Sequence, residues 1–159
     1  MVAGSGAIPG WPAPTVTKPS EAARAISARM AGDPFNLDRF VQAQAGGIYK
    51  RTLAELHAGC KQSHWMWFIF PQHRDLGRSP TAQYYGLSGV DEARAYAEHP
   101  LLGERLRECA RAIFPHLAAN RPEDILGPVD ALKLKSSMRI FAEAVPDEPL
   151  FAQVLASAA

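Results

Sequence analysis

The spacing of apolar residues predicts helices along most of the chain. Leu37, Phe40 and Val41 recur at i, i+3 and i+4, the spacing of one face of a helix. Asn36 precedes this run and is placed to cap it, while Pro115 is expected to end or kink a later helix. The same spacing predicts further helices over residues 49–58, 91–98, 102–115, 129–145 and 148–155.

A run of six large apolar residues, Trp65–Phe70, interrupts the helical pattern. Each aromatic ring removes a large apolar area from water, so we expect this run to be buried. It is the one segment that could be a strand, and one strand cannot form a sheet. Residues 71–90 follow it and are rich in Pro and Gly, and long connections of this kind are often functional. The sequence predicts a mostly α fold: a single compact multi-helix domain with a long irregular loop after an aromatic segment.

The first part of the chain has a different character. Residues 1–32 are crowded with Gly and Pro and show no apolar periodicity. Such a segment cannot bury enough apolar surface to offset its chain entropy. We therefore predict a flexible Gly/Pro-rich tail over residues 1–32 and a helical domain over residues 33–159.

Composition excludes several classes of protein. The net charge of +1 gives no basic field for nucleic acid, and no apolar run is long enough to span a membrane. Two cysteines without a CxxC motif make no disulfide framework, so we expect a cytoplasmic protein. The histidines lack metal-binding spacing and no phosphate-binding glycine motif is present, so we expect neither a metal nor a cofactor.

Several short segments occur together in a characteristic order. They are Ser63-His-Trp-Met-Trp-Phe-Ile-Phe-Pro-Gln72, Leu76-Gly-Arg-Ser79, Tyr85-Gly-Leu87, Asp91-Glu-Ala93, His99-Pro-Leu101 and Asp130-x-x-Lys133-x-x-Ser-Ser-Met138-x-x-Phe141. From about Asp33 to Leu155 the chain resembles the uncharacterised family called domain of unknown function 1810. The resemblance implies one mostly helical domain and no particular activity. It also leads us to expect a further short segment beyond Ala159 in such proteins, to which a site element could belong.

A weaker similarity concerns the NADAR N-glycosidases, which act on ribosylated nucleotide-derived compounds. It rests on the order of the elements Tyr85, His99-Pro-Leu101, Ile125-Leu-Gly127, Lys133 and Met138. This similarity implies hydrolysis or transfer at an N-glycosidic bond as the first reaction to test.

The ends of the aromatic segment carry the first candidate site residues. His64 is the candidate acid–base catalyst, because imidazole exchanges protons near neutral pH. Ser63 and Gln72 flank the segment as candidate ligand contacts, and Trp65 and Trp67 could stack on a ring of the ligand. The alternative is that His64 is a core-edge residue bonded to a backbone carbonyl and that both tryptophans belong to the core.

The connection after the aromatic segment carries a second group. Arg74 and Arg78 suit phosphate or carboxylate, and Ser79 precedes a proline where a turn could expose its N–H. Tyr85 could supply a stacking face or a phenolic donor to the same ligand. The alternative is a solvated loop in which one of the two adjacent tyrosines packs and the other is exposed.

A third group lies on the helix over residues 129–145. Lys133 could act as a base if buried, and the hydroxyls of Ser136 and Ser137 could bind phosphate oxygens. The alternative is an exposed face with an ion pair between Asp130 and Lys133, or serines that permit close helix packing.

These groups favour an uncharacterised protein that binds a small anionic, ring-bearing, nucleotide-like ligand and could be an N-glycosidase-like hydrolase. The alternative is a non-catalytic protein-interaction module in which the aromatic segment is purely structural. The sequence leaves open whether the chain is an enzyme and what its oligomeric state is.

Overall fold

The computed structural model describes residues 33–159, and the predicted tail over residues 1–32 lies outside them. Within the described part the chain forms helices and no strand, which confirms the mostly α fold. The elements are α2 (Asp38–Ala43), α3 (Ile48–Ala58), α4 (Met66–Ile69), a 3-10 helix η1 (Arg74–Leu76), α5 (Pro80–Tyr85), α6 (Val90–Glu98), α7 (Leu102–Ala119), α8 (Pro122–Leu126), α9 (Pro128–Ala144) and α10 (Pro149–Ala158).

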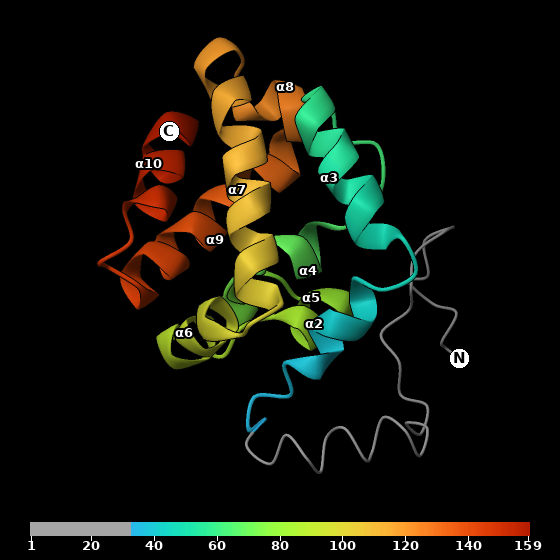
Figure 1. Cartoon of the computed structure of the whole chain (residues 1–159), viewed down its shortest axis with the longest axis vertical. Coiled ribbons are helices and arrows are strands. Elements are labelled where there is room, and N and C mark those ends of the chain that lie inside the picture. The colour runs from blue at the N-terminus through green and yellow to red at the C-terminus, as the bar shows by residue number, and fades with distance from the viewer. Residues whose placement is uncertain (1–32) are drawn as a thin grey trace.

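The longest helix, α7, runs through the middle of the molecule, with α3 on one side and α10 on the other (Figure 1). Helix α9 contacts α6, α8 and α10. The short α4 contacts α2, α5, α7 and α9, so the aromatic segment packs against helices from both the earlier and the later parts of the chain. Within the segment, Trp65 contacts Glu55 of α3 and Trp67 contacts Lys133 of α9.

The core is built around aromatic side chains from distant parts of the chain. The Tyr96 ring lies 5.0 Å from the Phe40 ring and 5.5 Å from the Phe141 ring, between centroids. Met66, Phe68 and Phe70 of the aromatic segment are completely buried, as predicted. The segment forms one helical turn rather than a strand, because a single turn satisfies its backbone groups locally where no other strand is available.

The start of α2 differs from the prediction. Asn36 does not cap the helix; it adopts a positive φ of 54° in the preceding turn. The carboxylate of Asp33 accepts the backbone N–H groups of Leu37 at 2.7 Å and Asp38 at 3.2 Å instead. A carboxylate serves the free N–H groups of a helix start better than a neutral amide does, because its charge also suits the helix dipole.

A buried ion pair fixes the far end of the connection after α4. Arg39 Nη2 lies 2.7 Å from Glu92 Oε2, and both side chains are almost completely buried. Arg39 also donates to the carbonyls of Tyr84 and Gly86, while Glu92 Oε1 accepts the Ser88 N–H at 2.9 Å. The pair therefore joins α2, the end of α5 and the start of α6.

The connection itself is more regular than the sequence suggested. It contains η1 and α5, and its ends are joined by two backbone hydrogen bonds of 2.8 Å, from Arg74 to Leu87 and from Leu87 to Gln72. Helix α5 was missed because it has only six residues and no apolar repeat. Helix α7 also continues past Pro115 to Ala119, because Pro115 is exposed and packing of the following turn outweighs the lost hydrogen bond.

Candidate functional site

Glu55 on α3 is a buried acid at the centre of a hydrogen-bond cluster. Its Oε1 accepts the backbone N–H groups of Gln62 at 2.7 Å and Ser63 at 3.0 Å. The same atom accepts the indole N–H of Trp65 at 2.8 Å, and Oε2 accepts the Ser63 hydroxyl at 2.6 Å. The carboxylate thus holds the loop over residues 60–65 against the end of α3.

The electrostatics of Glu55 follow from these contacts. Burial acts to raise its pKa, but the hydrogen bonds from the Ser63 and Trp65 side chains and from two backbone N–H groups outweigh burial. The pKa of Glu55 is therefore lowered, and the carboxylate stays ionised at neutral pH. It serves as a structural anchor for the loop rather than as a proton donor.

The loop brings Lys61 to the start of α9, where a second lysine lies. Lys61 Nζ is 3.0 Å from Asp130 Oδ2, and Lys133 Nζ is 3.5 Å from Asp130 Oδ1. Lys133 Nζ also lies 4.0 Å from the centre of the Trp67 ring, a cation–π contact. We call Lys61, Asp130, Lys133 and Trp67 the two-lysine site.

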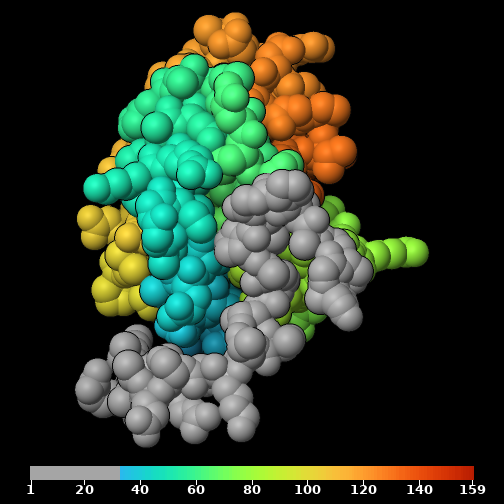
Figure 2. Space-filling view, turned by 90° about the vertical axis from the view of Figure 1, so that its right-hand side faces the viewer, coloured from blue at the N-terminus to red at the C-terminus, as the bar shows by residue number. Residues whose placement is uncertain are grey.

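The neighbouring elements hold the first of these lysines in place. The backbone N–H of Lys61 donates to the Ile125 carbonyl at 2.9 Å, and its Nζ donates to the Ser63 carbonyl at 2.6 Å. Figure 2 shows the green loop after α3 lying between the blue-green helix α3 and the orange region of α8 and α9. The site therefore depends on α3, α4, α8 and α9 together.

The charged side chains of the site are largely shielded from water. The exposed fraction is 10% for Lys61, 19% for Asp130 and 17% for Lys133. Charges shielded in this way interact more strongly than charges at an open surface. Two ammonium groups facing one carboxylate leave one positive charge in excess among these three side chains.

The serines predicted on α9 lie next to this site in sequence. Asp130, Lys133 and Ser137 are spaced i, i+3 and i+7, so all three lie on one face of α9. Ser137 is completely buried, and its hydroxyl has no hydrogen-bond partner among the described residues. Ser136 is half-buried on the adjoining face.

Two other residues that were predicted to contact a ligand, Gln72 and Tyr85, make contacts inside the protein. The Gln72 amide is buried and donates to the carbonyls of Met66, at 3.2 Å, and Phe70, which closes the turn of α4. Tyr85 is 3% exposed and its ring packs against Phe68, and burial raises its pKa. Neither side chain faces solvent, and their ligand-binding role stays a prediction.

The basic residues of the connection lie at the surface. Arg74 donates to the Gly86 carbonyl at 3.3 Å, and Ser79 Oγ accepts the Ala82 N–H at 3.1 Å to cap α5. Arg78 is exposed. These contacts of Arg74 and Ser79 stay within the connection itself.

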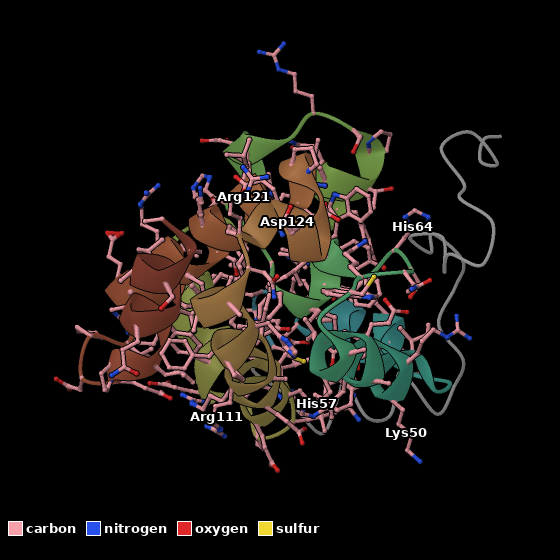
Figure 3. The ribbon with its side chains drawn as sticks, turned by 90° about the horizontal axis from the view of Figure 1, so that it is seen from above. Lys50, His57, His64, Arg111, Arg121 and Asp124 are labelled. Atoms are coloured by element: carbon pink, nitrogen blue, oxygen red, sulfur yellow. The ribbon has the colours of Figure 1, made fainter. Side chains whose placement is uncertain are left out.

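His64, the predicted acid–base residue, is exposed at the outer edge of the loop after α3 (Figure 3). The carboxylate of Glu55 instead binds its two neighbours, Ser63 and Trp65. The fold therefore separates the polar end of the aromatic segment into an inward-facing pair and an outward-facing imidazole.

Sequence reasoning missed Glu55 and the position of Lys61. A signal for Glu55 was present, because it lies on the apolar face of α3, between the buried residues Thr52 and Leu56 at i−3 and i+1. An acid at such a position needs donors close by. Lys61 carried no such signal, because its contacts arise only when the loop folds back onto α9.

The described part of the chain contains no group of three or more His, Cys, Asp or Glu side chains placed to hold a metal ion. Over the same residues, none of the helices combines the length and the apolar character that crossing a membrane requires.

Comparisons with known proteins give a family and a fold. Residues 34–158 match the family described as a protein of unknown function (DUF1810), as the sequence resemblance implied. The chain is similar to the crystal structure of the conserved hypothetical protein Rv1873 from Mycobacterium tuberculosis. The two share 50% sequence identity with a TM-score of 0.74, over 78% of this chain and 87% of that chain. A search of curated proteins finds no match.

Proposed function

This chain belongs to the DUF1810 family, whose function is unknown, and we propose that its two-lysine site binds a small anionic ligand that carries a ring, such as a nucleotide derivative. The observation that carries the proposal is the convergence of the Lys61 and Lys133 ammonium groups on the single carboxylate of Asp130. Two shielded cations for one anion favour a further negative charge at this position.

The half-buried indole of Trp67 supports the ring-bearing part of the ligand. Its ring already contacts the Lys133 ammonium at 4.0 Å, and the side chain is half-buried beside this cation. Aromatic side chains beside lysines bind nucleobases by stacking while the cations bind phosphate. The site thus combines both kinds of contact that a nucleotide-like ligand requires.

For a reaction, we propose hydrolysis at an N-glycosidic bond as the first to assay, with Lys133 as the residue to replace. The sequence offered His64 and Lys133 for proton transfer. Lys133 contacts both Asp130 and Trp67, whereas His64 points outward from the loop, so Lys133 is the better placed of the two. Under this proposal Ser63 and Trp65 position the loop through Glu55.

A thermal-shift screen with nucleotides, ADP-ribose, flavin precursors and simple phosphates tests the binding proposal. A ligand at a hundred times its dissociation constant adds about 2.7 kcal/mol of stability, which for a chain of this length is a rise in Tm of roughly 6–10 °C. Lys133→Gln should abolish the rise, while the matched control Lys135→Gln, on the opposite side of α9, should retain it. A rise that persists unchanged in Lys133→Gln would place the ligand elsewhere.

The interaction module remains the second candidate, because one observation favours it. Val129 and Leu132 on α9 are 64% and 62% exposed, which is high for large apolar side chains. A measurement of molar mass by light scattering for wild type and Leu132→Glu tests whether this face binds a second copy. A mass that falls in Leu132→Glu would support the module, and a monomeric wild type would exclude self-association through this face.

We also propose a cytoplasmic location for this binding activity. Cys60 and Cys109 are both free in the structure, and Cys60 is exposed. Exposed free thiols are typical of reducing compartments.

A further inference from the structure

The carboxylate of Asp130 occupies an unusual position in the two-lysine site. Each of its oxygens faces a different ammonium group, Oδ2 at 3.0 Å from Lys61 Nζ and Oδ1 at 3.5 Å from Lys133 Nζ. Two oxygens of a phosphate group would bridge two lysines in the same way. The chain therefore places its own carboxylate where an external anion would bind.

The charges around Asp130 leave this carboxylate outnumbered. The other nearby acid, Glu55, accepts four hydrogen bonds from its own loop, and among the described residues it forms no ion pair with either lysine. A monovalent carboxylate thus neutralises one of two shielded ammonium charges. A divalent phosphate monoester would neutralise both, which is an electrostatic reason for exchange.

The position of Asp130 in the chain permits that exchange. It lies in the first turn of the seventeen-residue helix α9, and its side chain is 19% exposed. If the side chain turned toward solvent, the carboxylate would remain near the positive end of the helix dipole. Displacement would therefore not leave an uncompensated buried charge.

We infer that Asp130 is an internal competitor for the ligand, and that the two-lysine site selects divalent phosphate groups because only they outcompete its carboxylate for Lys61 and Lys133. This inference rests on the proposed function and adds the class of anion and a residue that sets affinity. Asp130 is then a specificity-determining residue whose removal strengthens binding, the opposite of what a ligand-contacting or merely structural residue would show.

Titration calorimetry with AMP and with sodium acetate, at constant ionic strength and pH 7.5, tests the inference. The variants are Asp130→Asn and the matched control Asp124→Asn. Like Asp130 and Lys133, Asp124 and Arg121 form an ion pair spaced i, i+3, at 3.4 Å. Asp124, however, lies at the surface (Figure 3). Asp130→Ser provides a second variant if Asp130→Asn does not fold.

The inference predicts that Asp130→Asn binds AMP at least about tenfold more tightly than wild type, because a charged competitor has been removed. It also predicts that Asp130→Asn gains measurable acetate binding that wild type lacks, and that Asp124→Asn matches wild type. Equal or weaker AMP binding by Asp130→Asn, with binding by wild type intact, would overturn the inference and leave the proposed function standing. Absence of AMP binding in wild type and in both Asp130 variants would overturn both.

Discussion

Removing the charge of Glu55 should weaken the fold by a definite amount, because four donors depend on this carboxylate. Glu55→Gln keeps the shape of the side chain, and the amide oxygen can still accept the three bonds made to Oε1. Hydrogen bonds to a charged group contribute about 1.5–3 kcal/mol each, against about 0.5–1.5 kcal/mol for neutral pairs. The loss is about 1 kcal/mol per bond, and since bonds to one group are not additive, we expect a total of about 2–3 kcal/mol.

Glu55→Ala should cost more, about 4–5 kcal/mol, because it leaves the buried indole N–H of Trp65 without its acceptor. Urea denaturation at pH 7.5, followed by tryptophan fluorescence, measures both losses against the control Glu143→Gln, which replaces an exposed acid on α9. The control should lie within about 0.5 kcal/mol of wild type.

The pH dependence gives a second measure of the same carboxylate. The pKa of Glu55 is lowered in the folded state, so the unfolded chain binds the proton more tightly. Its contribution is complete above the ordinary carboxyl value of 4.5 and is lost as pH falls through the folded pKa. The difference between wild type and Glu55→Gln should therefore shrink at low pH. A Glu55→Gln variant as stable as wild type at pH 7.5 would refute the role given to this carboxylate.

Three further predictions concern the fold, each measured by urea denaturation. Gly103→Ala should cost about 3 kcal/mol, because the added Cβ would lie 2.1 Å from the Ala97 carbonyl oxygen, whereas Gly89→Ala in open space should be nearly neutral. Arg39→Ala should cost about 3–5 kcal/mol by leaving its buried carboxylate partner unpaired. Burial lowers the pKa of His99, whose Nδ1 accepts two backbone N–H groups at the start of α7, so stability should fall as pH drops below 6.5. His99→Asn, which does not titrate, should lack that part of the fall; an equal fall in both proteins would contradict it.

Much of the fold could be predicted from the sequence because its helices are long and periodic. The stripe that includes Leu106 and Ile113 identified α7, and that of Leu134, Met138 and Phe141 identified α9. The short helices α5 and α8 were missed, because five or six residues contain too little of a repeat to identify. Helix α5 is capped by the Ser79 hydroxyl, whereas α8 has no side-chain cap and is stabilised by burial of Ile125 and Leu126.

The candidate site could be predicted only in part, for a different reason. Trp67 and Lys133 could be singled out as residue types, but their contact depends on how the loop over residues 60–65 folds back between α3 and α9. That fold depends on Glu55, whose four donors become neighbours only in three dimensions. Local patterns report the periodicity of an element well, and they carry little information on contacts between elements.

The proposed function depends on binding of an anionic ligand at the two-lysine site, beside Trp67. The most direct test records the tryptophan indole N–H signals in a proton–nitrogen correlation spectrum during titration with AMP, with Trp67→Phe used to assign the signal. We expect the Trp67 signal to move in a saturable manner in wild type and to stay fixed in Lys133→Gln. A Trp67 signal that does not move at millimolar AMP, or that moves equally in Lys133→Gln, would contradict it.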